Sequence, residues 1–247
     1  MRIAALYDIH GNLPALEAVL AEIDREGADQ IVIGGDVAAG PMPRLTLERL
    51  QRLPVPVHFI QGNADTELVQ AREPAGEVAL PNTDPTSWAA RQLGPDRLRE
   101  VARWPLTVTL DVPGVGRVLF CHATPRSNTR VFTAQTPEAR VQPEFEGVDV
   151  DLVVCGHTHM PFDRPVGRCR VVNAGSVGMP YGRPGAAWLQ LGPNVQFRHT
   201  AYDRAAAARR ILETDFPQVD GFARENLLQV PSAAEALAYF AGLEGAG

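Results

Sequence analysis

The stretch Arg2-Ile-Ala-Ala-Leu-Tyr-Asp8-Ile-His10 joins a short apolar run to two side chains that bind metal ions well. Residues 2–7 predict a buried strand, because an apolar run of this length suits the interior of a sheet. Asn12 and Pro14 then predict the start of a helix, and Gly27 its end. The chain therefore opens with a strand, a polar loop and a helix.

The same order returns twice in the next forty or so residues. Residues 30–33 predict a second buried strand, which runs into Gly34-Gly35-Asp36, and a helix is expected over 44–52. Residues 57–60 predict a third strand, which runs into Gly62-Asn63-Ala64-Asp65. Strands that alternate with helices in this way form a parallel sheet with right-handed crossovers.

From residue 105 onward the pattern favours a second, mixed or antiparallel sheet. Residues 106–110 and 117–120 flank Pro113-Gly114-Val115-Gly116, which indicates a hairpin. Residues 153–155 predict another buried strand, and more strands are expected near 169–172, 186–191 and 195–200. The predicted fold class is α/β: a four-layer αββα sandwich of two mixed β-sheets flanked by helices.

We expect a single domain over residues 1–247, with two helical additions. Residues 65–104 are predicted to be helical, broken by prolines, and to form a cap or connection outside the core. Residues 203–247 are predicted to form a C-terminal helical extension, with helices over 205–212, near 222–228 and over 232–243. Ser232 is expected to cap the last of these helices.

Composition excludes several classes of protein. No apolar run approaches the ~18–20 residues of a membrane span, and the N-terminus does not resemble a signal peptide. A net charge of −6 without a basic block argues against broad nucleic-acid binding. Three widely spaced cysteines argue against a disulfide framework and for a reducing cytoplasm. A homo-oligomer is compatible with the sequence, which leaves the oligomeric state open.

Four short motifs and one separate histidine each follow a predicted buried strand. The candidate metal ligands that they supply are Asp8, His10, Asp36, Asn63, His122, His157 and His159. Each motif is weak alone, but strand ends can converge at one edge of a sheet, and this set can hold two divalent ions side by side. The remaining histidines, His58 and His199, lie outside these motifs and are expected to be structural or at the surface.

The charges of such a site favour an anionic phosphate ester as the substrate. Two divalent ions bring +4, whereas Asp8 and Asp36 bring −2 and the other ligands are neutral. The site would attract phosphate even in an acidic protein, and the ions would lower the pKa of bound water toward ~7.

Taken together, these motifs resemble those of the calcineurin-like metallophosphoesterases. The resemblance runs in order over residues 8–159, and the runs 121–125 and 171–178 are similar to the bacterial and archaeal small-phosphodiesterase branch. It implies one metal site made of Asp8, His10, Asp36 and His159. It implies a second made of Asp36, Asn63, His122 and His157, with Asp36 shared and a bridging hydroxide that attacks phosphorus. Mn is the metal that the resemblance favours, and Fe, Ni or Zn would also suit these ligands.

One position departs from the pattern of the family. Many members carry a histidine directly after the asparagine, where this chain has Ala64, which cannot protonate a leaving group. Because general acid catalysis contributes ~10²–10⁴-fold, its absence favours substrates with good leaving groups, or a proton donor from elsewhere in the protein. Variants of the family that lack this histidine are often phosphodiesterases, so the resemblance implies a phosphodiesterase. Asp65 is a further catalytic candidate beside Asp36 and Asn63: either it orients a ligand histidine, or it is a carboxylate at a helix N-terminus.

The expected partner is a small phosphate-ester substrate. Asn12 is a candidate to bind its phosphate, although helix capping also explains this residue. Arg126 and its neighbour Arg130 could grip phosphate bidentately or lie at the surface. Two other functions stay open: a phosphomonoesterase or nucleotide phosphatase with the same metals, and a non-catalytic scaffold of the same fold, similar to a retromer-type subunit.

Overall fold

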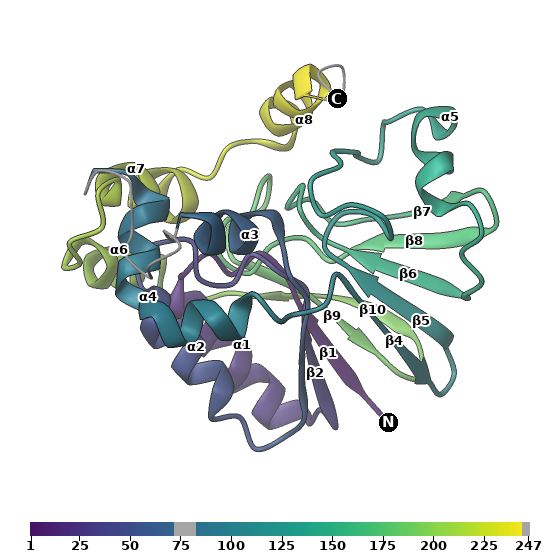
Figure 1. Ribbon diagram of the computed structural model, residues 1–247, viewed down its shortest axis with the longest axis horizontal. Coiled ribbons are helices and arrows are strands. Elements are labelled where there is room, and N and C mark those ends of the chain that lie inside the picture. The colour runs from purple at the N-terminus through teal and green to yellow at the C-terminus, as the bar shows by residue number, and fades with distance from the viewer. Residues whose placement is uncertain (72–82, 244–247) are drawn as a thin grey trace.

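Two five-stranded mixed sheets form the centre of the computed structural model, which describes residues 1–71 and 83–243 (Figure 1). The first sheet has the order β10-β9-β1-β2-β3, and its first three strands along the chain are parallel. Its strands are β1 (Ile3–Leu6), β2 (Gln30–Ile33), β3 (Val57–Phe59), β9 (Ala186–Leu191) and β10 (Val195–Thr200). The predicted parallel β-α-β-α-β unit is therefore present. The prediction that residues 186–191 and 195–200 belong to the second sheet is wrong, because β9 pairs antiparallel with β1 and β10 pairs antiparallel with β9.

The second sheet has the order β4-β5-β6-β8-β7. Its strands are β4 (Thr107–Val112), β5 (Gly116–Cys121), β6 (Leu152–Cys155), β7 (Phe162–Val166) and β8 (Cys169–Asn173). The predicted hairpin joins β4 to β5, while β5, β6 and β8 run parallel to one another. Both sheets are mixed, as the sequence predicts.

The sheets pack face to face through alternate residues of β1. Ile3, Ala5 and Tyr7 enter a core shared with β5, β6 and β8 of the second sheet. Ala4 and Leu6 point to the opposite face and pack against helices. This alternation follows from the two-residue period of a strand, and it explains why the run is apolar throughout.

Three helices cover the outer face of the first sheet: α1 (Leu13–Glu26), α2 (Pro43–Gln51) and α4 (Pro85–Val101) (Figure 1). The sequence predicts that residues 65–104 stand outside the core, yet α4 buries Ala89, Ala90 and Leu93 within it. Gly94 and Pro95 kink this helix without removing it from the core. The helical part of 65–104 thus belongs to the helical layer, while residues 72–82 lie outside the described part of the chain.

The outer layer on the second sheet is thin. It consists of α5 (Glu138–Val141) and the 3-10 turn η1 (Gln142–Phe145), which pack Val141 and Phe145 against the sheet together with Phe132. The sequence predicts neither element, because each is only one turn long. The four layers are nevertheless complete.

The C-terminal extension is helical over its described part. It contains α6 (Arg204–Leu212), α7 (Val219–Ala223), the π-helical turn η2 (Arg224–Leu228) and α8 (Ala233–Leu243), whereas residues 244–247 lie outside that part. Ser232 caps α8 as predicted, since its hydroxyl accepts from the amide of Glu235 and the Glu235 carboxylate accepts from the amide of Ser232. Among the described residues, no helix combines the length and the hydropathy that crossing a bilayer requires.

One strand escapes the sequence prediction. β7 contains Pro165, and proline argues against a central strand. β7 is instead an edge strand, paired only with β8, and an edge position tolerates the missing amide donor.

Gly34 allows the two sheets to approach at the end of β2. A Cβ atom at this position would lie 1.9 Å from Cε1 of Tyr7, whose fully buried hydroxyl donates to the carbonyl of Val154 over 3.0 Å. We therefore expect Gly34→Ala to destabilise the protein by roughly 1–3 kcal/mol or more, because an overpacked core must shift. Thermal melting tests this expectation. Gly242→Ala is the control, because a Cβ there meets nothing within 4 Å; an unchanged melting temperature for Gly34→Ala would contradict the packing argument.

Candidate functional site

The predicted ligand side chains come together at the carboxyl ends of five strands. Asp8 and His10 follow β1, Asp36 follows β2, and Asn63 follows β3. His122 follows β5, while His157 and His159 follow β6. Backbone hydrogen bonds join these loops directly: the amide of His10 donates to Asp36, and the amide of Gly156 donates to His122. Residues about 150 positions apart therefore share one site, as the strand-end argument predicts.

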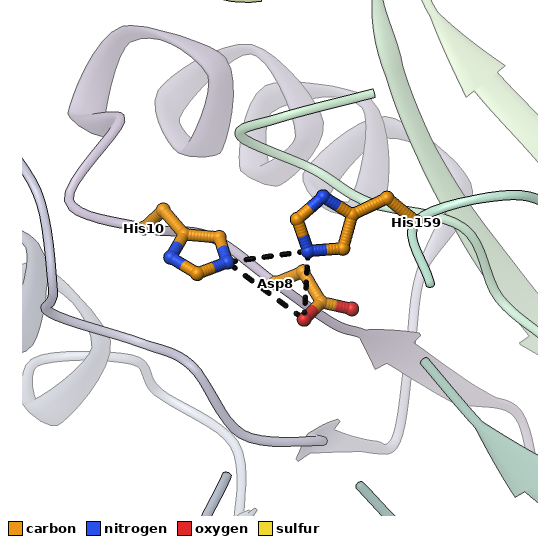
Figure 2. Close-up of side chains that lie close together, drawn as sticks. All are labelled: Asp8, His10 and His159. Carbon is orange, nitrogen blue, oxygen red and sulfur yellow. Dashed lines mark hydrogen bonds and ion pairs between the residues drawn. The ribbon is translucent and has the colours of Figure 1, made fainter. Parts of the chain in front are cut away.

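The first group of ligands consists of Asp8, His10 and His159 (Figure 2). Oδ1 of Asp8 lies 3.3 Å from Nε2 of His159 and 3.9 Å from Nε2 of His10. The two histidine Nε2 atoms are 3.3 Å apart. Figure 2 shows both rings directed at the same carboxylate from different segments of the chain. The ligand atoms are thus near enough to surround one ion.

The second group lies beside the first. Nε2 of His122 is 3.4 Å from Oδ2 of Asp36 and 3.1 Å from Oδ1 of Asn63. The ring of His157 lies edge-on to that of His122, with 5.1 Å between the centroids. Asp8 also reaches this group, because its Oδ1 lies 3.9 Å from Nε2 of His122. Oxygen and imidazole groups of this kind suit a second divalent cation.

Asp36 lies between the two groups. Its Oδ2 is 3.6 Å from Nε2 of His10 and 3.4 Å from Nε2 of His122. Its other oxygen, Oδ1, accepts a hydrogen bond from the amide of Ala64 over 2.8 Å. One carboxylate oxygen is therefore fixed by the backbone, and the other faces both groups, as a shared ligand requires.

Backbone carbonyls set the orientation of three ligand rings. Nδ1 of His122 lies 2.8 Å from the carbonyl of Gly34, Nδ1 of His159 lies 2.8 Å from that of Met179, and Nδ1 of His10 lies 3.3 Å from that of Ala39. An Nδ1–H that donates to a carbonyl leaves a lone pair on Nε2, which is the atom that each ring turns toward the carboxylates. The rings are oriented as metal ligands.

The short distances between acceptor atoms bear on whether divalent cations fit this site. Nε2 of His10 and Nε2 of His159 are in contact with each other and with Oδ1 of Asp8, and acceptor groups at such distances repel unless positive charge lies between them. Oδ1 of Asp8 and Nε2 of His157 are also buried without a hydrogen-bond partner. The donor set and these unpartnered atoms fit bound cations.

The pKa values of the ligand residues also indicate that this site needs positive charge. Although burial opposes ionisation, His122 and His10 hold the pKa of Asp36 well below its usual range. Burial also disfavours a charged His122, yet Asp36 and Asp8 raise the pKa of that ring to about 10. Buried carboxylates thus remain charged only beside a cation, and an added proton on His122 supplies that charge when no metal does.

The backbone at the site is strained. Among the described residues other than glycine, those with positive φ are Asp8, His10, Asp36, His157 and His159, with φ between 48° and 66°. Each of them is a predicted ligand. Left-handed backbone is costly for residues with a Cβ, and it persists where surrounding contacts hold it for a function.

Asp65 organises the loop that carries Asp36. Its Oδ2 accepts from the amides of Asp36 and Gly62 over 2.7 and 3.0 Å, and its Oδ1 accepts from the amide of Val37 over 3.0 Å. Burial, followed by the charge of Asp36, raises the pKa of Asp65 to about 7. The described hydrogen bonds join Asp65 to no ligand histidine, so it positions Asp36 through the backbone while it also caps α3 (Asn63–Gln70).

The two candidate phosphate-binding residues are engaged with the protein. Asn12 is fully buried, and its side chain accepts from the amide of Ala15 and donates to the carbonyl of Gly178. Its capping role is the one that the structure displays. Arg126 is exposed and donates to the carbonyl of Glu146, while Arg130 reaches the carbonyl of Arg140. Within the described part of the chain, neither arginine forms a hydrogen bond or an ion pair with a ligand residue.

Three further residues contact the ligands or the loops that carry them. Two of the three lie in a run that the sequence analysis singles out without giving them a role. Nδ2 of Asn173 donates to the carbonyl of Gly156 and the hydroxyl of Thr158, which fixes the turn between the last two histidines. The hydroxyl of Ser176 donates to the carbonyl of Asp8. Both lie in the run 171–178. Tyr181, which no motif indicates, stacks on the ring of His159 at 5.6 Å and is backed by Phe240 of α8.

The cysteines beside the ligands face away from them. Cys121 and Cys155 are free, fully buried, and packed in the core on the outer side of the second sheet. Burial raises the pKa of the Cys121 thiol above 9, so it remains protonated. Only oxygen and imidazole groups therefore meet at the site.

Comparison with known proteins agrees with this arrangement. The model of the calcineurin-like phosphoesterase superfamily domain matches residues 1–191, which include every predicted ligand. A metallophosphoesterase from Sphaerobacter thermophilus has a similar structure, with a TM-score of 0.69 and 25% identity over 90% of this chain and 98% of that one.

Two curated relatives are similar in sequence. The phosphodiesterase YfcE of Escherichia coli K12 is 28% identical over 204 residues, which cover 79% of this chain and 89% of that protein. The uncharacterized protein MJ0912 of Methanocaldococcus jannaschii is 29% identical over 164 residues, or 65% of this chain. The chain spans less than two thirds of MJ0912, 63% of its length.

Proposed function

Since the chain belongs to the calcineurin-like phosphoesterase superfamily, we propose that it is a metal-dependent phosphoesterase with two divalent cations and that phosphodiesters are its preferred substrates. The observation that carries the proposal is the cluster of buried carboxylate and imidazole groups around Asp8 and Asp36, whose ligand atoms are directed at one another. Such a cluster is suited to bind cations and has no evident use without them.

The residues divide into two ligand sets that share one carboxylate. Asp8, His10, Asp36 and His159 would hold the first cation, and Asp36, Asn63, His122 and His157 the second, as the family resemblance implies. When bound, divalent cations polarise the phosphoryl oxygens and lower the pKa of water, which makes hydroxide available near neutral pH. Oxygen and imidazole ligands without thiolate suit Mn, Fe, Ni or Zn, and Mn is proposed because the resemblance to the family favours it.

The remaining side chains hold the ligands in register. Asp65 fixes the amides around Asp36, and Asn173 fixes the turn that carries His157 and His159. Because the ligand side chains are already held in place, they need not reorganise during the reaction, and this contributes to the rate.

The preference for diesters rests on Ala64. The methyl group at this position has no proton to give, and the backbone amide of Ala64 is already engaged with Asp36. Hydrolysis then depends on a leaving group that departs without help from a side chain there, so activated and diester substrates are favoured. YfcE, whose name describes a phosphodiesterase, supports the same preference.

We also propose a reducing compartment, the cytoplasm, as the place of the reaction. The three cysteines are free and buried, which is usual for proteins that are kept reduced.

The test compares hydrolysis of bis-p-nitrophenyl phosphate and p-nitrophenyl phosphate by the purified protein with added Mn²⁺. We expect faster cleavage of the diester, loss of activity with a chelator, and recovery when Mn²⁺ is returned. Faster cleavage of the monoester would make the protein a phosphatase in which another group replaces the absent acid. If the protein bound metal and cleaved neither ester, the catalytic proposal would fail in favour of the scaffold.

A further inference from the structure

A cavity of about 630 Å³ opens beside the ligand His10. Its inner wall contains His10, Ala39 and Met179. The carbonyl of Ala39 accepts from His10, and that of Met179 accepts from His159. One end of the cavity is therefore built from the loops that hold the first ligand group.

The opposite wall of the cavity comes from residues 216–226 of the C-terminal extension, here called the C-terminal wall. Phe216 and Phe222 contact each other edge to face at 6.1 Å, and Trp88 of α4 contacts Phe216 at 5.5 Å. Both phenylalanines belong to a buried apolar cluster that anchors the wall. The wall is thus a packed part of the fold with an apolar face, and it lies beyond the residues matched by the family model.

The charged side chains of the C-terminal wall that line the cavity are acidic. They are Asp220 and Glu225, both exposed, and no arginine within residues 1–71 and 83–243 lines the cavity. Glu225 is paired with Arg224, whereas Asp220 has no ion-pair partner in the described part of the chain. A negative group on the wall of this cavity favours a cationic or uncharged ligand and repels a second anionic group.

The volume of the cavity limits the size of the group that it can bind. Cavities of ~300–1,000 Å³ accommodate a small organic molecule, so 630 Å³ has room for a group as large as a nucleoside. The apolar face of Phe216 and Phe222 suits a flat or aromatic surface, and the acidic edge suits hydroxyl or amino donors.

We propose that the C-terminal wall selects the substrate. It accepts the organic part of a phosphate ester when that part is uncharged or cationic, bears hydrogen-bond donors and has an apolar face. It rejects an organic part that carries a second phosphate. The inference rests on the proposed phosphoesterase function. Asp220 is the residue that sets the charge preference, and the two phenylalanines provide the surface on which the organic group packs.

The test uses two substrates with the same scissile bond. They are thymidine 5′-(p-nitrophenyl phosphate) and the same ester with a phosphate on its 3′-oxygen, both followed by release of p-nitrophenol with Mn²⁺. The wild-type protein is expected to cleave the uncharged nucleoside ester with a kcat/KM roughly tenfold above that of the 3′-phosphorylated ester. Asp220→Arg is expected to remove or reverse this preference, and Asp220→Asn to reduce it.

Glu213→Arg is the matched control, because it makes the same change of charge at an exposed position that does not line the cavity. Its preference should equal that of the wild type. Melting temperatures establish that all variants are folded. If the wild type cleaves both esters and Asp220→Arg leaves their ratio unchanged, the inference is overturned while the phosphoesterase function stands. If the wild type binds metal and cleaves neither ester, the function itself fails.

Discussion

Replacement of Asp36 by Asn is expected to lower kcat/KM for a phosphodiester by about 10³-fold or more and to reduce metal binding at both sites. Oδ2 of Asp36 faces His10 and His122, and Oδ1 is held by the amide of Ala64. Asparagine has nearly the same shape, but it carries no negative charge and offers one oxygen instead of two. The measurement is steady-state hydrolysis of bis-p-nitrophenyl phosphate at saturating Mn²⁺.

Asp96→Asn provides the matched control for this change. Asp96 lies on α4, 86% of its side chain is exposed, and it forms an ion pair with Arg99. Since surface ion pairs contribute little, its kinetics should equal those of the wild type. Wild-type rates in Asp36→Asn would show that the carboxylate is not needed and would contradict its role as the shared ligand.

Replacement of Asp65 by Asn is expected to weaken metal binding by roughly 10–100-fold and to destabilise the fold by about 1–3 kcal/mol. Amides of Asp36, Gly62 and Val37 donate to the two oxygens of Asp65, so either orientation of an asparagine side chain leaves a buried amide facing another donor. The loop that holds Asp36 would then shift. Metal titration and thermal melting measure the two effects.

Asp203→Asn is the control for Asp65→Asn. Asp203 caps α6 by accepting from the amide of Ala206 over 2.9 Å at an exposed position, and asparagine is an equally good N-cap. This variant should match the wild type in both measurements. If Asp65→Asn bound metal as tightly as the wild type, Asp65 would be only a helix cap, and its proposed action through the backbone of Asp36 would be wrong.

The ligand set could be predicted because each ligand follows an apolar strand. Short buried strands can be identified in a sequence as apolar runs, and the carboxyl ends of parallel strands lie at the same edge of a sheet. Asp8, Asp36 and His122 therefore meet in space although their positions in sequence are far apart. The parallel order of the first sheet follows from the same alternation of strands and helices.

Other features depend on tertiary contacts that no local pattern records. β7 carries a proline, and only its place at the edge of the second sheet makes it a strand. The burial of α4 depends on the helices it meets, which its prolines do not reveal. The role of Asp65 depends on amides nearly thirty residues away, and the cavity beside His10 depends on the C-terminal wall.

The most direct test of the two-cation site is its metal content. Inductively coupled plasma mass spectrometry on protein that has been loaded with Mn²⁺ and then desalted should find two ions per chain, and fewer than one in Asp36→Asn. Two ions are predicted because Oδ2 of Asp36 lies between His10 and His122, which belong to different ligand groups. A wild-type protein that retained no divalent metal, or the same amount as Asp36→Asn, would contradict the account.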